Sequence, residues 1–149
     1  MISKIFVAAA ASLLAVSTAN AQSCQKNFKV VGVPSITAVS YKSSGVLPKT
    51  DAKKALDNAH RAMLAEGFEN IKVDKAMGSL TAKQETSGSG REQTLRVVVR
   101  KSGKGSRIDV VFMVQAGQIA PEDVTRDSIC RLISQPASTQ NQRSLLINL

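Results

Sequence analysis

Two segments in the second half of the chain, joined by a short glycine-containing connection, constrain its fold most strongly. Residues 94–101 and 107–115 each alternate apolar and polar side chains, with the period of two that is typical of half-buried β-strands. The connection contains Gly103 and Gly105, which suit a tight turn between antiparallel strands. The sequence therefore predicts a β-hairpin, one side of which faces a hydrophobic core.

The rest of the chain predicts further strands and two helices around this hairpin. The expected elements are a strand at 28–33 continued at 36–41, a loop from Ser43 to Pro48, a helix at 50–66 capped by Thr50, strands at 68–74 and 80–85, the hairpin, and a helix that begins at Pro121 and stops at 134–136. The order β-α-β-β-β-β-α predicts an α+β fold, in which a single antiparallel sheet carries two helices packed on one face. Polar residues dominate from 137 onward, which predicts a domain over 22–136 and a flexible tail over 137–149.

The first 21 residues have the layout of a secretory signal peptide. Lys4 supplies a positive start, residues 5–16 form an almost unbroken apolar run, and Ala19 and Ala21 mark a cleavage site. The run is too short and wrongly flanked for a stable membrane span. We therefore expect cleavage after Ala21 and a mature protein that works in the periplasm or is secreted.

The chain is strongly basic, with a formal net charge of +9 that falls to +8 when Lys4 leaves with the leader. Such a surplus attracts anionic partners, which in a bacterial envelope include lipopolysaccharide phosphates, peptidoglycan carboxylates and acidic proteins. It can equally serve only to keep the protein soluble. Nucleic acid is the weakest candidate, because single-strand binders pair cations with stacking aromatics and the chain has no Trp, one Tyr and four Phe.

Two cysteines remain after export, Cys24 and Cys130, and an even pair in an oxidising compartment is most simply a disulfide. Closing a loop of about 100 residues stabilises a fold by roughly 4–5 kcal/mol in the chain-entropy model. A lipid anchor at Cys24 is not expected, because Gln22 makes the preceding residues a poor lipobox. Free reactive thiols are the third option, but no Cys-x-x-Cys spacing supports redox chemistry.

The hairpin also predicts a candidate binding face on the side that the helices leave uncovered. This candidate binding face consists of Arg96, Val98, Arg100, Val111 and Met113. A sheet covered on one side only should not expose that many apolar groups without a reason. A partner protein, another copy of the chain, or an amphiphile with an anionic group fits such a surface. The competing interpretation is that the N-terminal segment or the tail folds over it.

No catalytic or cofactor-binding arrangement is marked in the sequence. The single histidine, His60, is expected at the edge of an apolar helical stripe, and zinc needs several His or Cys ligands. Asp74 and Asp109 are each candidates for half of a carboxylate pair, although eleven acidic residues make such coincidences easy. The glycine-rich stretches at 87–91 and 103–105 lack the spacing of a P-loop and suit turns between strands. We therefore expect no enzyme activity, no cofactor and no metal site.

Residues 55–84 combine a helix that ends in a Gly-Phe step, a strand with Val-Asp, and a Gly-Ser-Leu-Thr-Ala return strand, followed by two strands and a helix carrying Cys130. This pattern resembles the small helix-grip-type domains of bacterial envelope proteins, including the repeated domain of the BamC-type outer-membrane assembly lipoprotein. The resemblance covers roughly residues 27–134 and includes no catalytic motif. It implies a non-enzymatic, envelope-located binding domain. Because this leader lacks a convincing lipobox, lipid anchoring and membership of that assembly complex are not carried over.

Together these features predict an exported, non-enzymatic binding or scaffold domain of the cell envelope that contacts an anionic or amphiphilic component or a partner protein. Two alternatives stay open. One is a secreted inhibitor or effector that inserts an exposed loop into another protein, for which residues 86–91 are the best candidate. The other is a small hydrolase whose residues meet only in the folded chain, which a pocket with converging titratable groups would favour.

Overall fold

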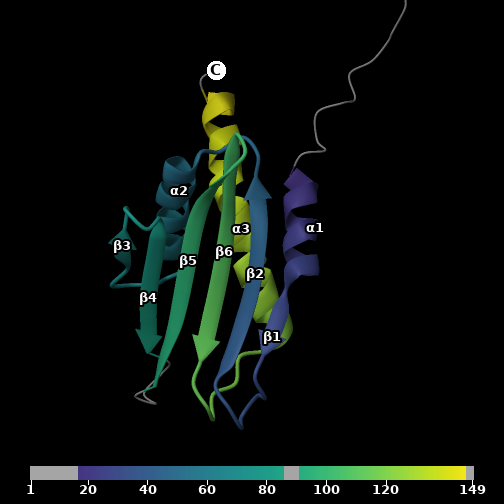
Figure 1. Ribbon diagram of the computed structural model, residues 1–149, viewed down its shortest axis with the longest axis vertical. Coiled ribbons are helices and arrows are strands. Elements are labelled where there is room, and N and C mark those ends of the chain that lie inside the picture. Colours follow the sequence, from purple (N-terminus) through teal and green to yellow (C-terminus); the bar gives the residue numbers. More distant parts are fainter. Residues whose placement is uncertain (1–16, 86–90, 147–149) are drawn as a thin grey trace, which may run out of the picture.

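The computed structural model describes residues 17–85 and 91–146. Its main element is a six-stranded sheet in the order β1-β2-β6-β5-β4-β3, in which every neighbouring pair is antiparallel. The strands are β1 (Lys29–Val31), β2 (Val39–Leu47), β3 (Lys72–Asp74), β4 (Ser79–Glu85), β5 (Glu92–Ser102) and β6 (Gly105–Val114) (Figure 1). The predicted hairpin is the pair β5–β6 at the centre of the sheet, and the two shortest strands form its edges.

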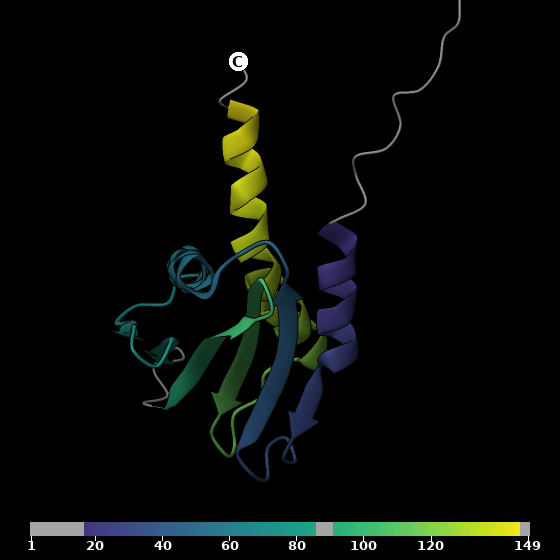
Figure 2. The same cartoon turned by 45° about the horizontal axis from the view of Figure 1, so that its top comes forward.

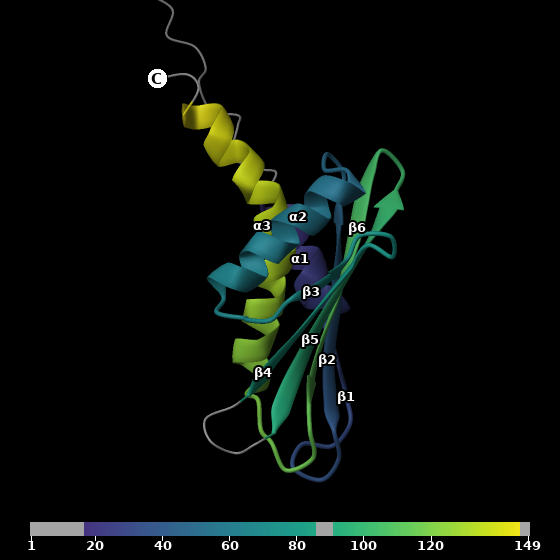
Figure 3. The same cartoon turned by 90° about the vertical axis from the view of Figure 1, so that its left-hand side faces the viewer.

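Three helices pack on one face of this sheet: α1 (Ser17–Asn27), α2 (Ala52–Ala65) and α3 (Glu122–Leu146). α2 contacts β4, β5 and β6, while α3 contacts β2 and β6, and α1 contacts β2 and α3. Figures 2 and 3 show all three helices on the same side, with the opposite side of the sheet bare of helices in the described part of the chain. The expected α+β class, a single antiparallel sheet with helices on one face, is confirmed.

The core lies between the helices and the inward-facing residues of the central strands. Leu95, Val97 and Val99 of β5 are buried, as are Ile108 and Val110 of β6. The apolar side chains that the helices bury against them are Leu56, Ala59, Met63, Ile129, Leu132 and Ile133. The alternation in the hairpin therefore places its apolar set on the helix side, as the sequence predicts.

An aromatic cluster closes one end of the core. The Tyr41 ring lies between Phe28 and Phe112, with ring centroids 6.2 Å and 6.3 Å away. Its hydroxyl donates a hydrogen bond of 2.7 Å to the Ala120 carbonyl oxygen. Burial raises the pKa of Tyr41, and the Glu122 carboxylate raises it further, because both disfavour the phenolate.

The first part of the chain differs from its prediction. The chain forms the short β1, turns, and returns beside it as the antiparallel β2, so that two strands precede α2. β2 also runs through Ser43, Ser44 and Gly45, and the loop predicted there is wrong. The reason is packing: a Cβ added at Gly45 would come within 2.6 Å of Ile133 Cγ2. Glycine at this position allows α3 to approach the sheet closely and does not form a turn.

The helix ends also correct the sequence interpretation. The N-cap of α2 is Asp51 instead of Thr50, and its side chain accepts a hydrogen bond of 2.9 Å from the Lys54 backbone N–H. α3 does not stop at 134–136 but continues to Leu146, although Pro136 has no backbone N–H to donate. The domain end predicted at 136 therefore falls inside a helix. The additional helix α1, absent from the predicted elements, spans the expected cleavage position after Ala21.

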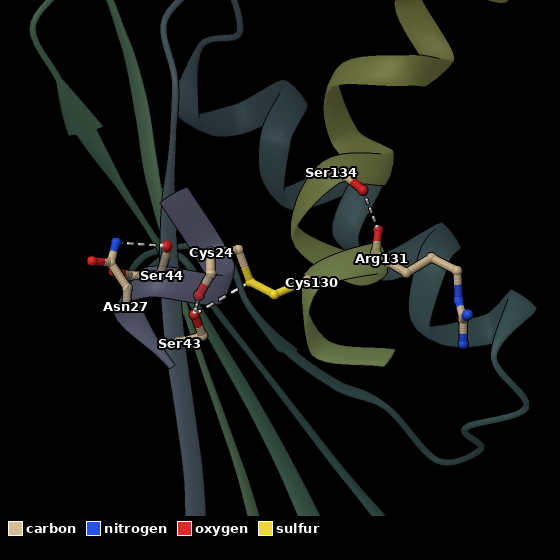
Figure 4. The surroundings of a disulfide bond; sticks show 7 residues. All are labelled: Cys24, Asn27, Ser43, Ser44, Cys130, Arg131 and Ser134. Carbon is tan, nitrogen blue, oxygen red and sulfur yellow. Dashed lines mark hydrogen bonds between the residues drawn. A yellow bond between two sulfur atoms is a disulfide. The ribbon is translucent and has the colours of Figure 1, made fainter. Parts of the chain in front are cut away.

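The predicted disulfide bond joins Cys24 of α1 to Cys130 of α3, with 5.5 Å between their Cα atoms and a sequence separation of 106 residues. Ser43 of β2 lies against this bond (Figure 4). Its hydroxyl donates a hydrogen bond of 2.6 Å to the Cys24 carbonyl oxygen, and its Oγ is 3.2 Å from Cys24 Sγ. The bond therefore attaches α1 to α3 where both pack against β2. In the ranges 17–85 and 91–146, no helix is long and apolar enough to cross a membrane.

Candidate binding face

The helix-free side of the sheet carries the residues that the sequence singled out. Strand pairing places Val111 opposite Arg96, Asp109 opposite Val98, and Arg107 opposite Arg100. Because their sequence neighbours on β5 and β6 face the core, these side chains point away from the helices. Met113 lies on the same side, opposite Thr94. The structure thus brings Arg96, Val98, Arg100, Val111 and Met113 together on one surface, the helix-free face.

A row of cations crosses this face at one level. Lys29 of β1 pairs with Lys42 of β2, which pairs with Val111, which in turn pairs with Arg96. On the far side of Arg96 the row continues through Thr81 of β4 to Lys72 of β3. With strands about 4.8 Å apart, the two intervals from Lys42 to Arg96 and from Arg96 to Lys72 are each about 10 Å. We call Lys29, Lys42, Lys72 and Arg96 the basic row.

The side chains of the basic row are exposed and lack acidic partners. None of the four makes an ion pair or a side-chain hydrogen bond with residues 22–84 and 91–134, whose side chains the structure describes. Their positive charges are therefore available to a ligand. Lys42, Arg96 and Lys72 are far enough apart to repel each other only weakly across exposed solvent, whereas Lys29 and Lys42 are directly opposite on adjacent strands and repel each other more strongly.

Arg100 is in a different situation from Arg96. Arg100 Nη2 is 2.7 Å from Asp109 Oδ2, and Arg107 Nε is 3.0 Å from Asp109 Oδ1. Arg107 also donates a hydrogen bond of 2.9 Å to Ser44 Oγ. Part of the charge of Arg100 is thus neutralised within the sheet. Of the two arginines predicted for the binding face, Arg96 is the one with a free guanidinium.

The apolar members of the face are more covered than the sequence alone indicates. Val98, Val111 and Met113 are half-buried, because the neighbouring long side chains shield them. More exposed apolar side chains lie toward the β1–β2 edge, where Val31 is 54% and Val46 is 41% exposed. The face is therefore mainly basic, with small apolar patches between the cations.

Three members of the basic row, Lys29, Lys42 and Lys72, were missed by sequence reasoning. Each lies outside the hairpin, and its position relative to Arg96 depends on the pairing of β2 with β6 and of β3 with β4. In β2 the buried residues Tyr41 and Ser43 flank the exposed Lys42, so Lys42 faces away from the core. The sequence indicates this orientation only if residues 43–45 are recognised as part of the strand.

The carboxylates considered for catalysis do not form a pair. Asp109 on β6 and Asp74 on β3 lie at the same level but three strands apart, which corresponds to about 14 Å. Two carboxylates that act together on a glycosidic bond lie about 5–9.5 Å apart. Asp74 instead accepts a hydrogen bond of 2.9 Å from the Met77 backbone N–H, which closes the turn between β3 and β4.

The other candidate groups also remain separate. His60 is half-buried on α2 and makes no hydrogen bond or ion pair with the described residues. Within 17–85 and 91–146, no group of three or more His, Cys, Asp or Glu side chains gathers in a way that could hold a metal ion. Of the loop 86–91 considered for an inhibitor, residues 86–90 lie outside the described residues.

Comparisons with known proteins do not place the chain in a family. No family model matches it, and no curated protein matches it. Among solved structures, a crystal structure of Ara h 8.0201 is similar at 14% sequence identity and a TM-score of 0.43, covering 68% of this chain and 99% of that chain. A likeness this distant carries no argument about function, which must come from the residues themselves.

Proposed function

We propose that this chain is an exported, non-enzymatic binding domain of the bacterial envelope, which holds an anionic partner on its helix-free face. The basic row is the observation that carries the proposal. It places four unpaired cations in register across the six strands, on the face of the sheet that no helix covers in the described part of the chain. We also propose that the fold is of the helix-grip type and that the resemblance to BamC-type domains reflects a shared envelope location.

The arrangement suits an extended polyanion better than a single small anion. The intervals of about 10 Å between Lys42, Arg96 and Lys72 exceed the reach of one phosphate or carboxylate, so separate negative groups must meet these three cations, while Lys29 and Lys42 on adjacent strands can share one. Lipopolysaccharide phosphates and peptidoglycan carboxylates are repeated anionic groups of this kind. The half-buried Val98, Val111 and Met113 between the cations add apolar contact for the body of such a partner.

The expected export of the chain favours anionic components of the envelope as its ligand. A leader with a cleavage site after Ala21 and a buried disulfide between Cys24 and Cys130 both suit an oxidising compartment outside the cytoplasm. Mass spectrometry of the protein isolated from its native envelope tests this part. We expect an amino terminus at Gln22 and two fewer hydrogens than the reduced chain, whereas an intact Met1 would remove the argument for an envelope ligand.

The test of binding is co-sedimentation of the mature domain with purified lipopolysaccharide aggregates, with peptidoglycan sacculi, and with an envelope protein extract on beads. We expect the wild-type domain to pellet with at least one of them at low salt and to be released at high salt, because screening weakens exposed charge contacts. Absence of binding to all three at low salt would reject the proposed function.

Two charge-reversal variants with equal net charge distinguish the face from the overall charge. Lys42→Glu/Arg96→Glu changes the basic row, while Lys26→Glu/Lys54→Glu changes two exposed cations on α1 and α2. We expect the first variant to bind about tenfold more weakly or worse and the second to bind nearly as the wild type does. Equal loss in both variants would show that net charge alone attracts the partner.

A further inference from the structure

A groove on the helix side of the sheet, about 330 Å³ in volume, opens between the first half of α3 and the ends of β4, β5 and β6. Leu95 and Phe112 form its floor, and Ile129 and Leu132 of α3 form a wall. It lies on the opposite side of the sheet from the basic row. Its volume is within the range of small-molecule sites, which are about 300–1,000 Å³.

The mouth of the groove is apolar and exposed. Ile119 is 71% exposed and Val124 is 59% exposed, and both line the groove, Ile119 in the segment before α3 and Val124 in the first turn of α3. Leu95, Ile129 and Leu132 deeper inside are at most 4% exposed. A ligand in the groove covers Ile119 and Val124 and contacts the apolar side chains of the core. Removal of this apolar surface from water is the main source of binding free energy for such a site.

The charges around the groove disfavour an ionic ligand. Among the lining residues that the structure describes, Glu66 is the one charged residue, and its carboxylate is already held by Arg131, with 2.9 Å between Oε1 and Nε. No lysine or arginine is among these described lining residues. A carboxylate, phosphate or sulfonate placed in the groove would therefore lose its hydration without gaining a cation.

Neutral hydrogen-bonding groups are present at one end. Gln84 and Gln93 are paired across β4 and β5 and point to the helix side, where both line the groove. Their side-chain amides make no hydrogen bond with residues 22–84 and 91–134, the part of the chain whose side chains the structure describes. Each amide offers both donors and an acceptor. The hydroxyls of Thr125 and Ser128, by contrast, are already bonded to the Pro121 carbonyl oxygen and to Arg131.

We infer that this groove is a binding site for a small, uncharged, largely apolar molecule that carries one hydrogen-bonding group, such as an aromatic or short-chain amphiphile without an ionised head. The apolar body lies along Leu95, Phe112 and Ile129, and the polar group meets Gln84 and Gln93. This inference goes beyond the proposed function and does not depend on it, because the basic row takes no part in it.

Two fluorescent probes that differ by one charged group test the inference. N-phenyl-1-naphthylamine is neutral at pH 7, and 1-anilinonaphthalene-8-sulfonate adds a sulfonate to the same ring system. In 0.5 M salt, which screens the basic row, we expect saturable binding of one neutral probe per chain, with the sulfonate bound about tenfold more weakly or worse. Equal affinity for both probes, or no saturable binding of the neutral one, would overturn the inference.

Variants then locate the probe. Ile119→Gln/Val124→Gln removes the apolar mouth from exposed positions, so the fold should be kept, and we expect about tenfold weaker binding of the neutral probe. Ser128→Phe, which fills the groove from α3, should abolish binding. Ile36→Gln/Met77→Gln is the matched control, since these apolar residues are 75% and 72% exposed away from the groove. Binding that is unchanged in the first two variants contradicts the inference.

Two further outcomes separate this site from its alternatives. Lys42→Glu/Arg96→Glu should bind the neutral probe as the wild type does, so failure of the proposed function and failure of this inference are distinguishable. Light scattering at the probe concentrations should give the mass of one chain. A concentration-dependent mass that falls in Ile119→Gln/Val124→Gln would show that a second copy fills the groove and would overturn the inference.

Discussion

Lys42 and Arg96 lie two strands apart at the same level of the helix-free face, with Val111 between them in register. Neither side chain has a partner within the described residues, although Asp109 lies on the same face. Its carboxylate is held by Arg100 and Arg107, so the face contains both free and neutralised cations.

Replacing Arg96 should affect binding, whereas replacing Arg100 should mainly affect stability. For Arg96→Ser we expect a change in the free energy of unfolding within about 0.5 kcal/mol, since the side chain is exposed and unpaired. For Arg100→Ser we expect a loss of up to about 1 kcal/mol, the usual worth of an exposed ion pair. Urea titrations measure the stabilities, and co-sedimentation with the anionic partner should be weakened more by Arg96→Ser. The reverse order would contradict the assignment of Arg96 as the free cation.

Removing the disulfide should destabilise the fold strongly. The bond closes a loop of 106 residues and joins α1 to α3. Cys24→Ala/Cys130→Ala therefore raises the conformational entropy of the unfolded chain. We expect the free energy of unfolding to fall by about 3–5 kcal/mol. Urea denaturation of the variant measures this, and the wild type treated with a reducing agent is the control that should show a similar loss. An unchanged midpoint in both would argue against a bond that stabilises the domain.

Gly45 should not tolerate a side chain. In Gly45→Ala the new Cβ meets Ile133 Cγ2 at 2.6 Å, and the β-branched Ile133 cannot easily rotate away. Overpacking of this kind costs about 1–3 kcal/mol. Ser40→Ala, on the opposite face of the same strand, is the matched control and should change stability little. If Gly45→Ala proved as stable as the control, the close approach of α3 to β2 would be wrong.

The phenol of Tyr41 should ionise only above its ordinary pKa, because burial and Glu122 disfavour the phenolate. The chain contains one tyrosine, so the absorbance of tyrosinate near 295 nm reports this residue alone. In the unfolded chain the tyrosine hydroxyl loses its proton near pH 10, whereas in the folded protein it does so only at higher pH. The stability that Tyr41 contributes is therefore lost as pH rises above about 10.

Tyr41→Phe serves as the control for that titration. It should lose about 1 kcal/mol at neutral pH together with the hydrogen bond to Ala120. Its unfolding free energy should then decline less steeply than that of the wild type above pH 10. A tyrosinate transition at or below the value for the unfolded chain would contradict the buried position of the hydroxyl.

Local sequence patterns were sufficient for the parts of the fold that depend on neighbouring residues. The alternation and the glycine turn predict the β5–β6 hairpin, and the even pair of cysteines, together with the expected export, predicts the bond between Cys24 and Cys130. The helix from Pro121 also buries Ile129, Leu132 and Ile133 as its spacing indicates. In each case the signal lies within one or two adjacent elements.

What the sequence could not provide depends on contacts between distant segments. Residues 43–45 have the composition of a turn, but they pair with residues 108–110 of β6, and the approach of Ile133 explains why position 45 is a glycine. The basic row likewise depends on the register of β2 against β6, which joins residues about 70 positions apart along the chain. Proline at 136 is an ordinary helix stop, yet α3 passes through it.

The proposed function is tested most directly by the reactivity of individual lysines in the unmodified protein. The mature domain is treated briefly with an acetylating reagent, free and co-sedimented with the anionic material that it binds, and acetylation of each lysine is measured by mass spectrometry. We expect Lys29, Lys42 and Lys72 to be protected in the complex, while Lys26, Lys54 and Lys104 react as in the free domain. Protection of the second set without the first would show that the partner binds elsewhere and that the basic row is not the binding site.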